Sequence, residues 1–132
     1  MTPAKVALYA QAVFRGVPLP AGWPADFAII TAWNPWGAAV AVAQNERADA
    51  ALHGGILAAG LTPHRVVGGS VDPTGHQEPG WAVAAVPDQA RAWGVAFRQD
   101  AVFLVHAGRL RLLACVTGQE IDLGRPFTML DR

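Results

Sequence analysis

Cysteine, lysine and serine each occur once in this chain of 132 residues, and the scarcity of cysteine and of serine excludes some classes of function. Because Cys115 is the only cysteine, an internal disulfide and a zinc site made of several cysteines are excluded. Ser70 lacks the glycine-flanked turn that presents a nucleophilic serine, so the serine-hydrolase pattern is missing. The chain has one lysine, Lys5, and nine arginines, and alanine, glycine and proline are abundant. This composition is typical of proteins encoded by GC-rich bacteria.

Charged residues are also few. They make up 15% of the chain, and the formal net charge is zero. The arginines are scattered among acidic residues instead of forming a basic stripe, so nucleic-acid binding is not expected. No apolar run reaches the ~20 residues that cross a membrane, and the first residues lack the basic and apolar regions of a signal peptide. We therefore expect a cytoplasmic protein with no membrane partner.

The hydrophobic fraction of 52% is enough for one domain with its own core. Three segments are expected: an N-terminal segment with a proline-rich connection at 1–26, an α+β core domain at 27–116, and a C-terminal tail at 117–132.

Hydrophobic periodicity predicts the order of elements along the chain. Helices are expected at 3–14, 45–59 and 87–99, and strands at 27–33, 61–67, 81–86, 101–106 and 109–116. Asn45 is the expected N-cap of the helix at 45–59, and residues 68–80 are expected to form a long polar loop that can act as a lid. The fold class is therefore α+β, a ferredoxin-like split βαβ sandwich with an extra C-terminal hairpin strand.

The stretch 27–37, FAIITAWNPWG, ends a buried strand in two tryptophans around an Asn-Pro step. Pro35 cannot donate to a strand ladder, so the strand should stop there. In the split βαβ order, this strand exit meets the starts of the strands at 81 and 101 and the start of the helix at 45. The candidate ligand-binding residues gathered at this end are Thr31, Trp33, Asn34, Asn45, Arg47, Trp81, Gln99 and Asp100, with Glu78 as the candidate catalytic residue.

This set of side chains suits a small anionic ligand, nucleotide-like or amino-acid-like, held by Arg47 and the helix N-terminus and oriented by amides. An alternative is a hydrolase or transferase that uses Glu78 as general acid or base. A purely structural interpretation is also open, in which Asn45 caps a helix, Asn34 forms a turn and Gln99 ends a helix.

A third function is a protein-interaction module. The strand at 109–116 would lie at a sheet edge, where it either pairs with a second copy in a homodimer or is covered by the tail at 121–129. The high apolar content favours the homodimer.

Metal and cofactor patterns are weak. His76-Gln77-Glu78 has the spacing found in zinc deaminases, but the partner motif Pro-Cys-x-x-Cys is missing. Asp72, His76 and Glu78 leave a weak loop metal site as a minor alternative. The paired glycines match no phosphate loop, so neither a metal nor a cofactor is predicted.

Four ordered motifs carry a resemblance to a known family. They are Ile30-Thr31-Ala32-Trp33-Asn34-Pro35, Asn45-Glu46-Arg47, Gly75-His76-Gln77-Glu78, and the segment from Phe97 to Phe103. Over residues 27–116 the chain resembles domain-of-unknown-function family 3293, a family of short bacterial proteins with a Thr-Ala-Trp-Asn-Pro motif. The resemblance implies that Thr31, Asn34, Pro35, Asn45, Glu78 and Gln99 belong to the shared pattern, and it implies no reaction. The chain departs from the pattern at Glu78-Pro79-Gly80.

Overall fold

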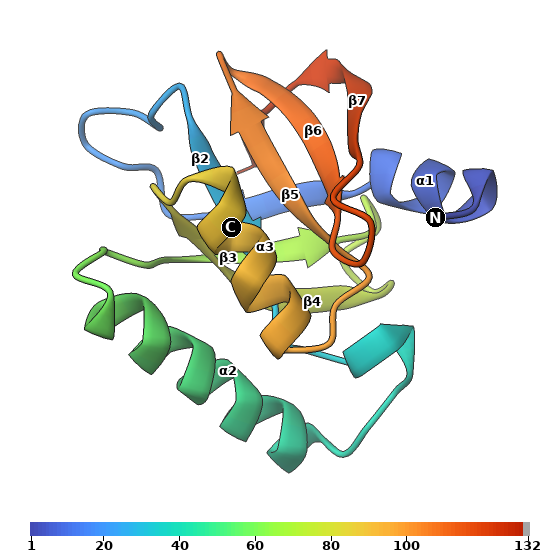
Figure 1. The fold of residues 1–132 in the computed structure, drawn as a ribbon. Coiled ribbons are helices and arrows are strands. Elements are labelled where there is room, and N and C mark those ends of the chain that lie inside the picture. The colour runs from blue at the N-terminus through green and yellow to red at the C-terminus, as the bar shows by residue number, and fades with distance from the viewer. Residues whose placement is uncertain (131–132) are drawn as a thin grey trace.

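The computed structural model describes residues 1–130, so positions 131 and 132 of the predicted tail lie outside the described residues. Figure 1 shows the arrangement of the elements. Their order is α1 (Pro3–Ala10), β1 (Val13–Gly16), β2 (Phe27–Ile30), the 3₁₀ turn η1 (Pro35–Gly37), α2 (Val42–Ala58), β3 (His64–Gly69), β4 (Gln77–Val83), α3 (Pro87–Ala96), β5 (Ala101–His106), β6 (Arg109–Ala114), β7 (Glu120–Pro126) and β8 (Met129–Leu130). Within residues 1–130, no helix is long and apolar enough to cross a membrane.

Within the described residues, eight strands form one sheet in the order β7-β6-β5-β2-β4-β3-β1-β8. Neighbouring strands pair antiparallel except β1 and β8, which run parallel. Helices and a mixed sheet in one chain confirm the predicted α+β class. β2 lies between β5 and β4, so its exit adjoins the beginnings of both neighbours.

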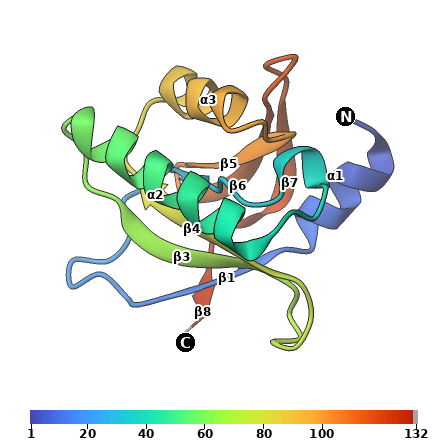
Figure 2. The same ribbon diagram turned by 90° about the horizontal axis from the view of Figure 1, so that it is seen from below.

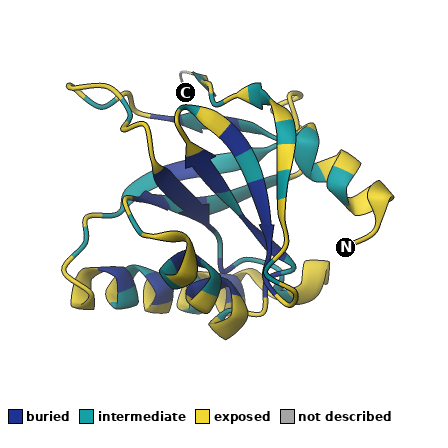
Figure 3. Cartoon of the chain, turned by 45° about the horizontal axis from the view of Figure 1, so that its top comes forward, coloured by how far each residue is buried: buried dark blue, intermediate teal, exposed yellow. Residues whose placement is uncertain are grey.

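The first face of the sheet is covered by α2 and α3. Leu52 and Ile56 of α2 and Trp93 of α3 pack on alternate residues of the central strands, among them Ala28 and Ile30. Figure 3 shows the buried residues running along these strands while the outer side of α2 is exposed. Burial of these side chains against the sheet is the main force that holds both helices in place.

The second face of the sheet is concave and holds a second core built around aromatic rings. Phe14, Phe27 and Ile29 are buried there, and Phe127 and Met129 pack against them. Residues 127–128 alone separate β7 from β8, although these strands lie at opposite ends of the strand order. The sheet therefore curls strongly, and the tail connects its two edges.

Helix α1 lies apart from the other two helices, as Figures 1 and 2 both show. It contains no buried residue. The guanidinium of Arg125 in β7 donates to the carbonyls of Ala10 and Ala12, and this contact fixes the end of α1 to the tail.

Several predicted element boundaries are wrong. The helix expected at 3–14 ends at Ala10, and residues 13–16 form β1. The loop expected at 68–80 is shorter because β3 and β4 extend into it as far as Gly69 and Gln77. Arg15 holds the remaining loop by donating to the carbonyls of Ser70 and Val71 at 3.0 and 2.8 Å.

Two other boundaries carry consequences for function. Helix α2 begins at Val42 with Ala41 as its N-cap residue, so Asn45 is not the N-cap. The edge of β6, which was the argument for a homodimer, is covered by β7. The alternative in which the tail covers this edge is the one found here.

Candidate functional site

The exit of β2 is a turn with an unusual backbone. Asn34, Trp36 and Gly37 have φ values of 48°, 55° and 74°, and Arg98, whose carbonyl accepts from the Trp36 N–H at 2.7 Å, has a φ of 57°. Such values are rare for a bulky residue. Non-glycine residues in this region cost of order 1–3 kcal/mol each, so the surrounding structure must hold them there. We call residues 33–37 the strained turn.

Buried amides hold the strained turn. Asn45 is 2% exposed and Gln99 is 6% exposed. The Asn34 N–H donates to Oδ1 of Asn45, and Nδ2 of Asn45 donates back to Oδ1 of Asn34, both at 2.9 Å. Nε2 of Gln99 donates to the carbonyls of Trp33 and Phe97, both at 3.1 Å.

Thr31 ties the same turn to the neighbouring strand. Its hydroxyl donates to the Pro79 carbonyl of β4 at 2.8 Å and accepts from the Trp33 N–H at 3.1 Å. These amides and this hydroxyl are thus engaged inside the protein. Their hydrogen bonds position the turn, as a structural role for these residues would require.

The strained turn presents Trp33 to a groove of about 330 Å³. Glu46 and Asp49 reach this groove from α2, and Arg65 reaches it from β3. The groove is lined by Trp33, Glu46, Asp49, Arg65, Val67 and Pro79, and we call it the Trp33 groove.

Arg65 and Asp49 neutralise each other in the Trp33 groove. The two guanidinium Nη atoms donate to the two carboxylate oxygens at 2.9 and 2.6 Å. The guanidinium carbon lies 3.6 Å from the ring centre of Trp81, a cation–π contact. The His53 ring centre lies 4.5 Å from that of Trp81. Trp81 therefore supports Arg65, and its buried Nε1 has no hydrogen-bond partner among the described residues.

Glu78 lies on the opposite, concave side of the sheet. It pairs in register with Gly68, and a Cβ atom at Gly68 would meet the ring of buried Phe14, which belongs to the second core. Residues directly opposite each other on paired strands point to the same face. Nε2 of His76 lies 2.5 Å from Oε2 of Glu78.

Asp100 belongs to the same sheet end, and α1 approaches it there. Nζ of Lys5 lies 2.8 Å from Oδ2 of Asp100. The ring of Tyr9 packs edge-on against Phe103 with 5.7 Å between ring centres. Burial, together with the nearby charges of Asp100 and Glu78, raises the pKa of Tyr9 to about 12. The phenol is thus a neutral hydrogen-bond donor near two carboxylates.

The predicted site residues therefore form separate groups. Thr31, Trp33, Asn34, Asn45 and Gln99 meet at the strained turn, and Trp81 supports the Trp33 groove. Glu78 and Asp100 contact partners from the concave side and α1. Arg47 is exposed on α2 and is not among the residues that line the groove.

One family model, described as "Protein of unknown function (DUF3293)", matches residues 30–102, which is more than half of the chain. The chain belongs to the DUF3293 family. This membership confirms the resemblance drawn from the sequence motifs. No curated protein and no solved structure matches the chain.

The region matched by the DUF3293 model contains the strained turn, its hydrogen-bonding partners and the Trp33 groove, whereas α1 and β6–β8 lie outside it. Sequence reasoning missed Arg65 and Asp49. Arg65 could have been found only from its place opposite Trp81 in the β3–β4 register. That register depends on the length of the hairpin, which the sequence alone does not determine. Tyr9 was also missed, because its partners are 69 or more positions away along the chain.

Proposed function

We propose that this chain is a small-molecule-binding domain whose ligand occupies the Trp33 groove. One observation carries the proposal: hydrogen bonds from Thr31, Asn45 and Gln99 hold a strained turn, and that turn presents Trp33 to the groove. Backbone strain maintained by its surroundings clusters at binding and catalytic sites. An unstrained connection from β2 to α2 would be enough to form the fold, so the strain points to a functional role for the turn.

The charges around the groove favour a ligand that carries a basic group. The Asp49–Arg65 pair is neutral as a whole, so the carboxylate of Glu46 leaves a net negative charge beside the indole of Trp33. An ammonium or guanidinium group gains from both the carboxylate and the ring face. The sequence predicted an anionic ligand, nucleotide-like or amino-acid-like, held by Arg47, and Arg47 lies outside the groove. Of these two forms, an amino-acid-like ligand also carries an ammonium group that suits the carboxylate.

Thermal-shift measurements with matched diffusible probes test this proposal. Agmatine and cadaverine supply basic groups, glutarate supplies acidic groups, and pentanediol supplies neither. We expect the basic probes alone to raise the melting temperature, because a ligand at 100 times its Kd stabilises the native state by about 2.7 kcal/mol.

Variants sharpen the thermal-shift test. Trp33→Leu should weaken binding by roughly 2–30-fold, the range of a cation–π contact, and Trp36→Leu is the control from the same turn. A shift produced by glutarate, or a basic-probe shift that is as large in Trp33→Leu as in the unchanged chain, would contradict the proposal.

A second candidate function is a hydrolase or transferase with Glu78 as general acid or base. The 2.5 Å pair of His76 and Glu78, with the neutral Tyr9 phenol nearby, favours it. On an ester or phosphoester substrate found by screening, Glu78→Gln should lower turnover by roughly 10²–10⁴. An unchanged rate in Glu78→Gln would eliminate this candidate.

Finer predictions from the sequence remain proposals. We propose that β5-β2-β4-β3 with α2 and α3 constitute a ferredoxin-like unit; the order of these strands and their antiparallel pairing support it. The division at residues 26 and 116, the bacterial origin and the cytoplasmic location stay predictions. The interaction module and the homodimer lose their argument at β6, where β7 covers the edge.

A further inference from the structure

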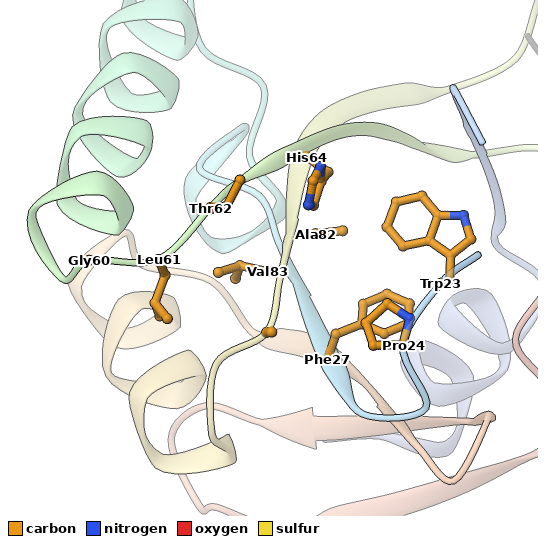
Figure 4. Close-up of a pocket in the computed structure, with 10 residues that line it drawn as sticks. Trp23, Pro24, Phe27, Gly60, Leu61, Thr62, His64, Ala82 and Val83 are labelled. Carbon is orange, nitrogen blue, oxygen red and sulfur yellow. The ribbon is translucent and has the colours of Figure 1, made fainter. Parts of the chain in front are cut away.

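A second pocket lies at the other end of β2, where the proline-rich connection enters the sheet. It has a volume of about 250 Å³ and shares no lining residue with the Trp33 groove. Trp23 and Pro24 come from the connection, Leu61 from the segment after α2, and His64 and Val83 from β3 and β4. Figure 4 shows these side chains around a common opening, with Trp23 and His64 on one side and Leu61 on the other.

Aromatic rings make one wall of this pocket rigid. Trp23 stacks on Phe27 with 5.3 Å between ring centres, and Phe127 meets both rings edge-on at 6.0 and 5.1 Å. The His64 ring meets Trp23 edge-on, with 6.0 Å between the ring centres. Phe27 is 3% exposed, whereas Trp23 is only half-buried. The wall therefore presents a fixed indole, and binding there would cost little conformational entropy.

The lining carries no carboxylate, ammonium or guanidinium group among the described residues. A charged ligand would lose its hydration here without gaining a partner, so the lining selects against charge. Its polar side chains are those of His64 and Thr62. An imidazole ring offers a donor and an acceptor nitrogen in its neutral form, and the His64 ring has no hydrogen bond to another described residue.

We propose that this pocket binds a small uncharged aromatic compound of one or two rings that bears a hydroxyl, amide or ring N–H group. The volume suits a ligand of this size, since pockets for drug-sized molecules begin at roughly 300 Å³. The ring of the ligand packs against Trp23 and Phe27 in an offset or edge-on arrangement. Its polar group bonds to the imidazole of His64. This site is independent of the proposed function of the Trp33 groove.

Three probes of similar size separate the chemistry that the pocket recognises. Phenol is aromatic and neutral, benzoate is aromatic and charged, and cyclohexanol is neutral but not aromatic. In titrations followed by ¹H–¹⁵N NMR on the full chain, we expect phenol to bind with shifts confined to residues 23–27, 60–64 and 82–84. Benzoate and cyclohexanol should bind at least about tenfold more weakly, because each lacks one of the two recognised features.

Substitutions distinguish this pocket from nonspecific contact with an indole. Trp23→Leu should weaken phenol binding by about tenfold, and Ala84→Leu, at an exposed position on the rim, should block entry while keeping the core intact. Trp36→Leu removes an indole that is 48% exposed elsewhere and should leave phenol binding unchanged. Shifts spread over the surface, equal binding of benzoate or cyclohexanol, or full phenol binding in Ala84→Leu would overturn the proposal.

Discussion

At the scale of single residues, Asn45 shows how a buried amide can set a backbone conformation. Both ends of its side chain bond to Asn34, one to the backbone and one to the side-chain amide. The left-handed conformation of Asn34 is thereby fixed, and the next residues follow it into the strained turn. The Thr-Ala-Trp-Asn-Pro motif indicated a site, and these hydrogen bonds show that the Asn of the motif is held in the conformation that forms the turn.

Removal of the Asn45 amide should destabilise the fold strongly. We expect Asn45→Ala to lower the free energy of unfolding by about 2–3 kcal/mol, because two polar atoms of half-buried Asn34 lose their partners and the buried Asn45 amide is removed. Gln44→Ala, at the exposed neighbouring position, should change it by less than about 0.5 kcal/mol. Urea denaturation of the two variants makes the comparison. Equal stability of both would show that the turn holds its shape without Asn45.

Tyr9 is the only tyrosine in the chain, so its ionisation can be followed without interference. Its pKa is raised to about 12, with burial as the largest cause. The unfolded chain releases this proton near the ordinary pKa of 10, before the folded chain does. The contribution of Tyr9 to stability is therefore complete below pH 10 and is lost as the pH rises toward 12.

Ultraviolet absorbance of tyrosinate tests the environment of Tyr9. We expect a midpoint near pH 12 in the native protein, and a lower midpoint in Glu78→Gln because one of the repelling carboxylates is gone. Glu120→Gln, on the exposed strand β7, is the matched control. A midpoint near 10 in the folded protein would mean that Tyr9 is solvated and distant from both carboxylates.

At the scale of elements, sequence patterns succeed where a segment has strong local chemistry. Pro87 and Asp88 begin α3 as predicted, and the Ala107-Gly108 turn has the positive φ values, 50° and 77°, that a tight hairpin needs. Gly60 follows α2 with a φ of 77°, which is typical of a residue that ends a helix.

Patterns fail where local chemistry is weak. The run of small residues before Asn45 carries no polar signal, and Ala41 has no side chain that can cap a helix, so the true start of α2 at Val42 is hidden. Arg47 was placed at a helix N-terminus for this reason. β1 was hidden because a strand of four residues beside a helix keeps helical spacing, and only its pairing with β3 reveals it.

The contact between α3 and the sheet gives a sharp prediction about glycine. A Cβ atom at Gly94 would lie 2.4 Å from Sγ of Cys115 and 2.9 Å from Val102. We expect Gly94→Ala to destabilise the protein by about 1–3 kcal/mol through overpacking. At Gly54, on the exposed side of α2, an added Cβ meets nothing within 4 Å, so Gly54→Ala should stabilise it by about 0.5–1 kcal/mol. Thermal denaturation compares the two, and equal effects would contradict the close packing of α3.

At the scale of the whole molecule, the curled sheet separates two kinds of chemistry. The helix-covered side carries the Trp33 groove with the carboxylate of Glu46, and the concave side carries Glu78 and the Tyr9 phenol, which packs against Phe103. The sequence analysis predicted that Trp33, Glu78 and Asp100 gather at one end of the sheet, and it did not include Glu46 or Tyr9. Their division between faces depends on residue-by-residue register, which the predicted strand limits missed by up to four residues at β4.

The most direct test of the binding proposal is the Trp33 indole N–H signal in a ¹H–¹⁵N NMR titration with agmatine. The account predicts a saturable shift of this signal and of residues lining the Trp33 groove, weakened by Glu46→Gln and unaffected by Glu120→Gln on β7. A Trp33 signal that does not move, or that moves equally in Glu46→Gln, would contradict it.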